Sequence, residues 1–362
     1  MEGGELKNIF KVWVLVFASL SYCYLIARRI AKGKLRLLSI IPVLCLFLLL
    51  PLNFSSIHLR GLTAFFLSWL ANFKLLLFAF GKGPLSLNPS MPLLRFISVA
   101  YFPIKIKYQS PNGSNGAKEN NHSFPFPSRI VPNSPLFYSI KVILLAVVLR
   151  LYDYSQYIHP LILRFLNCTH IYIGMETVLI TVAYLARLLL GLELEPTFKE
   201  PYLSISLQDF WSRRWNLMVS KILHPTVYEP TRRLAVQLFG IESEMSRLVA
   251  ILNTFFVSGL MHMLVWVYVG CWHPTWKTMF FFALNGVCLA AEVAVKKAVA
   301  GRWQLHPVVS WLLVNGFLFG TISWLLLSDI VRCQLDIKGV REYKAFEEFI
   351  KDVSGYRGFH GP

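Results

Sequence analysis

The chain has 362 residues, of which 55% are hydrophobic and only 15% are charged, and its mean hydropathy is +0.52. A soluble domain is about a quarter charged, so this composition excludes an ordinary soluble protein, and its apolar content excludes a disordered one. The formal net charge is +17, but the basic residues lie in short loops between long apolar runs, which indicates membrane topology and excludes nucleic-acid binding.

A membrane-crossing helix needs roughly 20 apolar residues, and the first part of the chain holds three such runs, at 10–27, 37–52 and 61–80. Basic residues follow the first run and no cleavage pattern comes after it, so we expect a retained anchor and not a signal peptide. Lys74, near the end of the third run, is expected to extend its amine to the membrane interface.

The composition changes at residues 81–135, which are rich in Pro, Ser, Asn and Gly and are predicted to form a flexible cytosolic loop. Within this loop, 93–106 is a short apolar segment that we expect at the interface. Further spans are predicted at 136–154, 175–194, 248–270, 277–295 and 307–330, while 158–172 either joins its neighbour or crosses alone. Residues 331–362 form a charged tail, helical around 342–351. The predicted fold is therefore an all-α polytopic membrane protein with eight or nine transmembrane helices.

Charge asymmetry across the loops predicts the orientation, because cytoplasmic loops carry the excess of Lys and Arg. With eight spans, the amino terminus lies in the lumen and residues 195–247 lie in the cytosol. The sequons at Asn112 and Asn121 would then be cytosolic and unmodified. Six scattered cysteines without a CxxC pair are expected to be free packing thiols, forming neither a disulfide framework nor a zinc site.

The most informative stretch is 201–230. Ser206 and Asp209 form a capping-box pattern, which predicts a helix beginning at Leu207. If that helix continued, one face would carry Asp209, Ser212, Arg213 and Asn216, and the other Phe210, Trp211, Arg214, Trp215 and Met218. Residues 195–247 are thus predicted to contain an amphipathic cytosolic helix, whose simplest role is an interfacial anchor.

Two ionisable side chains lie inside later spans. His262 stands in a run that is otherwise apolar from 251 to 268, and it is either functional or hydrogen-bonded to a neighbouring helix. Glu292 and Lys296 form an i, i+4 pair on the stripe that also carries Asn285 and Cys288, so we expect Glu292 and Asn285 to be structural.

Several signatures of other enzyme classes are missing from the sequence. It has no GxSxG elbow, HExxH motif, Walker loop or GxGxxG motif, and neither the HHxxxDG nor the HxxxD acyltransferase signature. The other histidines show no paired metal spacing, so we expect neither a metal nor a cofactor.

SLQDFWSRRWN at 206–216 and SGLMH at 258–262 resemble motifs of the plant wax synthase branch of the membrane-bound O-acyltransferase superfamily. KVWVLVFASLSYCY, WLANFKLLLFAF and FFFALNGVCLAAEVAVKK are also similar to that branch, so the resemblance covers most of the chain. It implies that Asn216 and His262 are the catalytic pair, with Asp209, Trp211 and Trp215 supporting the motif. The branch usually reads SGLMHE, and here Met263 replaces that Glu.

The resemblance implies transfer of a fatty acyl group from acyl-CoA, a co-substrate, to the hydroxyl of a long-chain alcohol in the endoplasmic reticulum membrane. His262 would be the general base, and Asn216 would orient a substrate or stabilise the oxyanion. Basic residues of the cytosolic segment would bind the CoA phosphates or anionic lipid: Arg213, Arg214, Lys221, Arg232 and Arg233.

Two alternatives remain. One is a sterol or diacylglycerol acyltransferase of the same superfamily, since no motif reports the shape of the acceptor chamber. The other is a polytopic lipid transporter with His262 and Glu292 on its pathway, which the absence of an internal repeat disfavours. Release of CoA distinguishes an enzyme from a transporter.

Overall fold

The computed structural model describes residues 3–88, 90–102, 135–190, 197–299 and 305–354. Every regular element in these ranges is a helix, which confirms the all-α prediction. The chain folds as two compact units. The first comprises Met1–Phe102, Val219–Ala290 and Trp324–Pro362, and the second comprises Pro103–Met218 and Ala291–Ser323. The predicted loop at 81–135 falls largely outside the described residues, as do both sequons.

Within the described ranges, seven helices are long and apolar enough to cross a membrane: Gly4–Arg29, Lys34–Asn53, Ile57–Ala79, Pro160–Leu188, Ser243–Tyr268, Trp276–Val299 and Pro307–Arg332. A further predicted span, 136–154, corresponds to α6 (Pro135–Leu151), which is shorter at 17 residues. The ambiguous run 158–172 does not cross alone, because α7 (Pro160–Leu190) passes through it and continues into the next predicted span.

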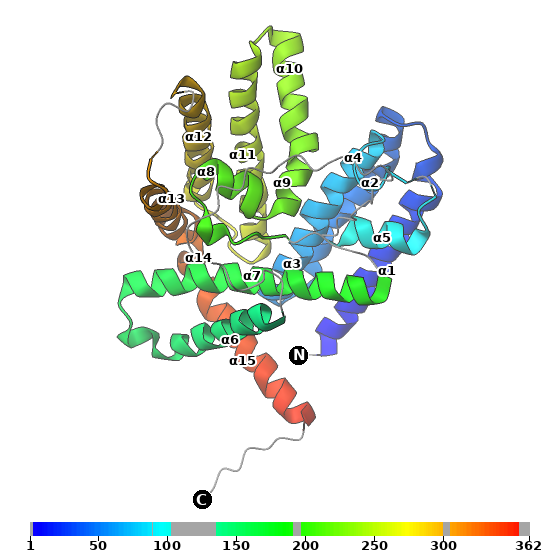
Figure 1. The fold of residues 1–362 in the computed structure, drawn as a ribbon. Coiled ribbons are helices and arrows are strands. Elements are labelled where there is room, and N and C mark those ends of the chain that lie inside the picture. Colours follow the sequence, from blue (N-terminus) through cyan, green and yellow to red (C-terminus); the bar gives the residue numbers. More distant parts are fainter. Residues whose placement is uncertain (1–2, 89, 103–134, 191–196, 300–304, 355–362) are drawn as a thin grey trace, which may run out of the picture. The chain divides into compact units, whose positions relative to one another are not determined.

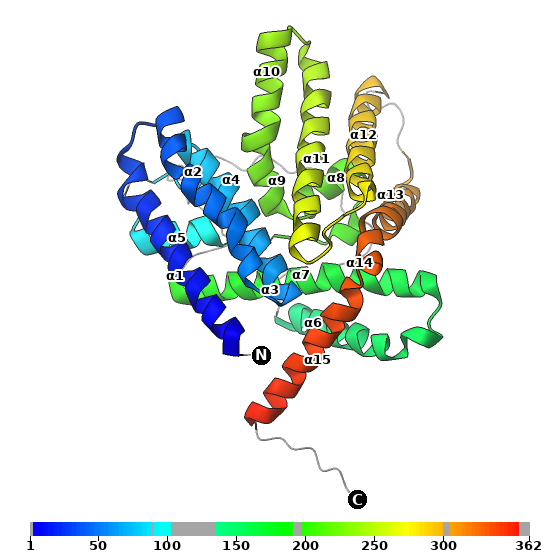
Figure 2. The ribbon, with the colours of Figure 1, turned by 180° about the vertical axis from the view of Figure 1, so that it is seen from behind.

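The first unit begins with α1 (Gly3–Leu25) and α2 (Lys34–Leu49), and α2 packs against α4 (Asn72–Ala79) (Figure 2). The third span enters as α3 (Ile57–Thr63), widens into a π-helical segment over Ala64–Ala71, and ends as α4. Most of this span is buried. A wide turn shifts the helix face by part of a turn, and such turns occur frequently at functional sites.

Lys74 on α4 corrects one prediction, because its side chain is fully buried and does not reach an interface. Its Nζ donates to the carbonyls of Val99 at 2.7 Å and Phe102 at 2.6 Å, at the end of α5 (Leu93–Tyr101). The last carbonyls of a helix have no intrahelical partner, so they satisfy the ammonium group inside the fold. The α5 helix itself buries Phe96 and its neighbours within the fold.

Two neighbouring helices come next in this unit. The helices α10 (Glu229–Phe239) and α11 (Ser243–Tyr268) form an antiparallel hairpin (Figure 1), whose turn contains Gly240 at a φ of +62°. The first part of α12 (Trp276–Val299) approaches α11 closely. A Cβ on Gly259 would lie 2.9 Å from Met279 Sδ, and one on Gly286 would lie 3.0 Å from Phe255 Cβ. Glycine at these positions therefore brings the two backbones together around His262.

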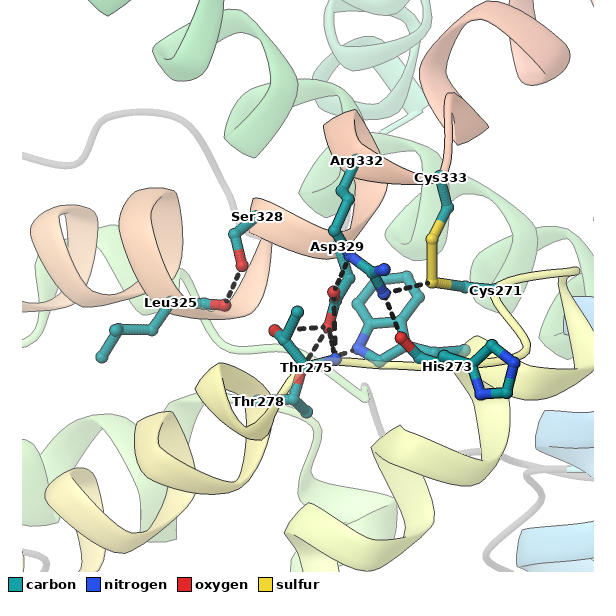
Figure 3. Close-up of polar contacts among 10 residues, drawn as sticks. Cys271, His273, Thr275, Thr278, Leu325, Ser328, Asp329, Arg332 and Cys333 are labelled. Atoms are coloured by element: carbon teal, nitrogen blue, oxygen red, sulfur yellow. Dashed lines mark hydrogen bonds and ion pairs between the residues drawn. A yellow bond between two sulfur atoms is a disulfide. The ribbon is translucent and has the colours of Figure 1, made fainter.

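Cys271 and Cys333 form a disulfide, so the prediction of free thiols was wrong for this pair. The residues lie 62 positions apart, just after α11 and after α14 (Ser328–Arg332). Packing places them together around the fully buried Asp329 (Figure 3). This carboxylate accepts from Thr275 N at 3.0 Å, Thr278 Oγ1 at 3.3 Å and Arg332 Nε at 3.1 Å. Cys23, Cys45, Cys168 and Cys288 are free, as expected.

The predicted helical tail is confirmed as α15 (Leu335–Ser354), which docks on the start of α3 through Glu342. Its carboxylate accepts from Ser56 Oγ at 2.7 Å, from Ile57 N at 2.7 Å and from His58 Nδ1 at 2.6 Å. Burial alone would raise the pKa of Glu342, but these hydrogen bonds outweigh it and lower that pKa to about 2.

In the second unit, α6 and α7 lie side by side (Figure 1) and are joined by a buried ion pair. Lys141 Nζ lies 2.7 Å from Glu176 Oε1, with their side chains only 12% and 8% exposed. The helix α13 (Pro307–Thr321) packs on α7, where the rings of Phe165 and Phe319 lie 6.0 Å apart. Two of these helices contact the segment that carries Asn216: the ring of Tyr172 on α7 lies 6.1 Å from that of Trp215, and Asn315 on α13 donates to the Ser204 carbonyl at 3.1 Å.

Candidate active site

The Asn216 segment starts as the capping box predicts. The helix α8 (Leu207–Asp209) begins after Ser206, whose Oγ accepts from Asp209 N at 3.0 Å. The helix continues as one π-helical turn over Phe210–Arg214 and then ends. The prediction of a continuous amphipathic helix through Met218 was therefore wrong, and Asn216 does not share a helical face with Asp209 and Arg213.

The physical reason is a backbone pairing with the chain upstream. Lys199 N donates to Arg214 O at 3.0 Å, and Leu217 N donates to Thr197 O at 2.8 Å. Between these bonds Asn216 adopts a left-handed conformation, with a φ of +37°, and its side chain is buried at 7% exposure. Asn adopts this region more readily than most residues with a side chain. Such a backbone costs free energy, and residues held in it cluster at functional sites.

An ion pair between Arg214 and Asp209 stabilises the turn that leads to Asn216. Arg214 Nε lies 2.7 Å from Asp209 Oδ2, and Arg214 Nη1 donates to the carbonyls of Lys199 and Glu200 at 3.3 Å. The ring of Trp215 stacks on Phe210 at 5.3 Å, and Trp211 meets Phe210 edge-on at 4.9 Å. The predicted motif residues therefore contact one another, and the guanidinium of Arg214 is engaged within the fold.

Glu292 binds the start of this same helix. Its Oε2 accepts from Leu207 N at 2.7 Å and its Oε1 from Gln208 N at 3.2 Å, while Lys296 Nζ donates to Oε1 at 2.7 Å. A carboxylate at a helix amino terminus satisfies N–H groups that lack an intrahelical partner and complements the helix dipole. The predicted i, i+4 pair with Lys296 is present. Glu292 also holds the amino terminus of α8, the helix that leads to Asn216.

His262 lies on α11 in the first unit, one turn beyond Ser258. Its Nδ1 is 2.8 Å from the Ser258 carbonyl oxygen, and because a carbonyl only accepts, Nδ1 carries the proton. A charged ring would be costly inside this apolar helix, so we take the imidazole as neutral, with the lone pair on Nε2. The rings of Phe282 and Trp69 lie 4.5 Å and 5.1 Å from the imidazole ring. The Nε2 atom of His262 can therefore accept a proton, and two aromatic rings surround the imidazole.

The remaining predicted site residues lie on several different helices. Arg213 is exposed in the second unit, and Lys221 is exposed on α9 (Leu217–Leu223). Arg233 Nη2 lies 3.3 Å from Glu229 Oε2, and Arg232 Nη2 donates to Ser243 Oγ at 3.4 Å. Asn285 is fully buried and donates to the Phe281 carbonyl of its own helix at 2.9 Å. In the described part of the chain, no group of three or more His, Cys, Asp or Glu side chains could hold a metal ion.

Sequence reasoning missed Trp69 and the Lys141–Glu176 pair. The pair had a visible signal, since both residues are ionisable and stand inside predicted spans. Trp69 had none, because an indole in an apolar run is an ordinary packing residue. The role of Thr197 comes from its backbone carbonyl and could not be found from side-chain patterns.

Comparison with known proteins identifies the family. The model of the membrane bound O-acyl transferase family matches residues 194–284, which include both Asn216 and His262. The chain is 42% identical to acyl-CoA–sterol O-acyltransferase 1 of Arabidopsis thaliana, over 96% of this chain and 97% of that protein. It is 44% identical to the long-chain-alcohol O-fatty-acyltransferase of Simmondsia chinensis, over 98% and 99% of the two chains.

The chain belongs to the membrane-bound O-acyltransferase family. A third relative, probable long-chain-alcohol O-fatty-acyltransferase 3 of Arabidopsis thaliana, is 44% identical over 88% of this chain and 89% of its own length. The resemblance noted from the motifs is thereby confirmed. This membrane-bound O-acyltransferase is an enzyme of the acyltransferase class and a multi-pass membrane protein.

Proposed function

We propose that the protein transfers a fatty acyl group from acyl-CoA to the hydroxyl of a long-chain alcohol, giving a wax ester and free CoA. The observation that carries this proposal is the neutral imidazole of His262, with Nε2 unprotonated in aromatic surroundings. A relative named long-chain-alcohol O-fatty-acyltransferase, 44% identical over nearly the full length, supports the alcohol as acceptor.

His262 and Asn216 take the two central roles in the proposed reaction. The alcohol oxygen attacks the thioester carbonyl carbon while Nε2 of His262 takes its proton. The carbonyl π pair moves to the oxygen and then returns, the carbon–sulfur bond breaks, and the thiolate recovers the proton from His262. Asn216 supplies a side-chain amide to orient the substrate, and its braced turn fixes that amide.

A sterol is the second candidate acceptor. The relative named acyl-CoA–sterol O-acyltransferase 1 is 42% identical over a similar length, and the difference from 44% does not separate the two acceptors. Fatty alcohols and sterols both present one hydroxyl on an apolar body, so the shape of the acceptor chamber decides between them.

We also propose the endoplasmic reticulum membrane as the location, with the Asn216 segment facing the cytosol. If α6 crosses, the eight spans alternate so that Cys271 and Cys333 lie in the lumen, where disulfides form and persist. The exposed side chains of Arg213 and Lys221 are proposed to bind CoA phosphates from the cytosol.

The test is expression in yeast that lacks its own neutral-lipid acyltransferases. Microsomes receive labelled acyl-CoA with a panel of fatty alcohols, sterols and diacylglycerol, and both ester and free CoA are measured. We expect wax ester and an equal amount of CoA. Steryl ester without wax ester would contradict the alcohol as acceptor, and no ester with any acceptor would contradict acyl transfer itself.

A further inference from the structure

The indole of Trp69 is a buried hydrogen-bond donor that finds no acceptor within the described part of the chain. Its side chain is 4% exposed, and Nε1 has no hydrogen-bond partner among the residues that the structure describes. Buried donors in native proteins are nearly always paired, because an unpaired one loses its bond to water and gains nothing in return. An unpaired donor kept in the fold therefore needs an explanation.

Two other indoles in the described part of the chain have an acceptor. Trp266 Nε1 donates to Thr278 Oγ1 at 3.0 Å, and Trp311 Nε1 donates to the Tyr202 carbonyl at 2.8 Å. Near Trp69, the hydroxyl of Ser68 donates to the Phe47 carbonyl at 2.9 Å. The Trp69 indole differs from those of Trp266 and Trp311, and its Nε1 is one of several buried side-chain atoms, Ser21 Oγ among them, that have no partner among the described residues.

The position of Trp69 connects this donor to the catalytic base. Its ring lies 5.1 Å from the His262 ring, with the two planes at 79°. Trp69 also belongs to the π-helical segment Ala64–Ala71, a kind of turn that is frequent at functional sites. An indole nitrogen donates and never accepts, so a partner for it would be an acceptor atom, and a ligand bound beside His262 could bring one.

We propose that the Trp69 N–H is a catalytic hydrogen-bond donor to the carbonyl oxygen of the acyl thioester. This inference rests on the proposed acyl transfer. When the alcohol oxygen bonds to the carbonyl carbon, the π pair moves to the carbonyl oxygen, and Trp69 donates to the resulting oxyanion. His262 holds the alcohol proton until the pair returns and the thiolate leaves with that proton. Because Nε1 of Trp69 is buried, the aromatic side chains beside it have to move when the acyl group binds.

Trp69→Phe removes the N–H and keeps an aromatic ring, and Trp266→Phe is the matched control, because that indole already has a partner. We expect Trp69→Phe to lower kcat on the order of 10²-fold, the usual cost of losing an oxyanion donor. KM for acyl-CoA should change far less, since the interaction forms in the transition state. Both substitutions shrink a packed ring and should cost some stability, but Trp69→Phe breaks no protein hydrogen bond and should not lose the further stability that the Trp266 hydrogen bond supplies. Trp266→Phe should lose stability and keep its turnover.

Replacement of Trp69 by 3-benzothienylalanine covers the case in which Trp69→Phe does not fold, because sulfur then substitutes for the N–H at nearly unchanged ring shape. The same fall in kcat is expected. Turnover close to wild type in either folded variant would overturn the proposal. The comparison uses whichever alcohol or sterol the wild type esterifies, so a wrong acceptor leaves the test intact, whereas a wild type that transfers no acyl group contradicts both proposals.

Discussion

The Cys271–Cys333 disulfide leads to the most quantitative stability prediction. Cys333→Ser opens a covalent loop between positions 62 apart. Loop-closure entropy for this length corresponds to about 4 kcal/mol at 25 °C. Spans that stay inserted in the bilayer already restrict the denatured chain, so part of that entropy is not available. We expect a loss of roughly 2–4 kcal/mol.

The assay is equilibrium denaturation in mixed micelles without reductant, on Cys271→Ser, Cys333→Ser and the double variant. All three should lose the same stability, because each removes the same bond, and reductant should reduce the wild type to their level. Cys288→Ser, at a free thiol, is the control and should match the wild type. Additive losses in the double variant would refute the reasoning, as would maleimide labelling of Cys333 in unreduced membranes.

Three other predictions follow from buried or paired charges. Glu292→Gln weakens the cap on α8 and should cost about 1–3 kcal/mol, lowering abundance more than turnover per molecule; an unchanged stability would contradict this role. The pKa of Glu342, about 2 against about 4.3 when unfolded, means that its stabilisation is full above the unfolded value and is lost as the pH falls toward 2. Protease cleavage of α15 should rise in that window, and Glu342→Gln should abolish the pH dependence. Lys141→Met leaves the Glu176 charge buried and unpaired and should cost about 3–5 kcal/mol, measured by denaturation. Adding Glu176→Leu to Lys141→Met should recover most of the lost stability. No recovery would contradict the stabilising role of the Lys141–Glu176 ion pair.

Local patterns predicted local structure well in this protein. The apolar runs located the long helices, the Ser206 pattern located the start of α8, and the spacing of Glu292 and Lys296 predicted their ion pair. Each of these features depends on residues within one or two helical turns, which is the range over which periodicity and capping act.

The errors occurred where distant parts of the chain meet. The helix stops before Asn216, and the N–H of Leu217 donates instead to Thr197 O, well upstream in the chain. Lys74 stays buried because the end of α5 presents two carbonyls to it. Cys271 finds Cys333 through packing around Asp329. None of these contacts follows from the spacing of residues in one element.

The central claim is that Nε2 of His262 takes the proton of the acceptor hydroxyl. Its most direct test is the rate of acyl transfer from acyl-CoA by His262→Ala protein, purified from membranes at wild-type abundance. We predict a fall of about 10²–10⁴-fold, the usual contribution of a general base, with binding of acyl-CoA largely retained. Esterification by that variant at close to the wild-type rate would contradict the account.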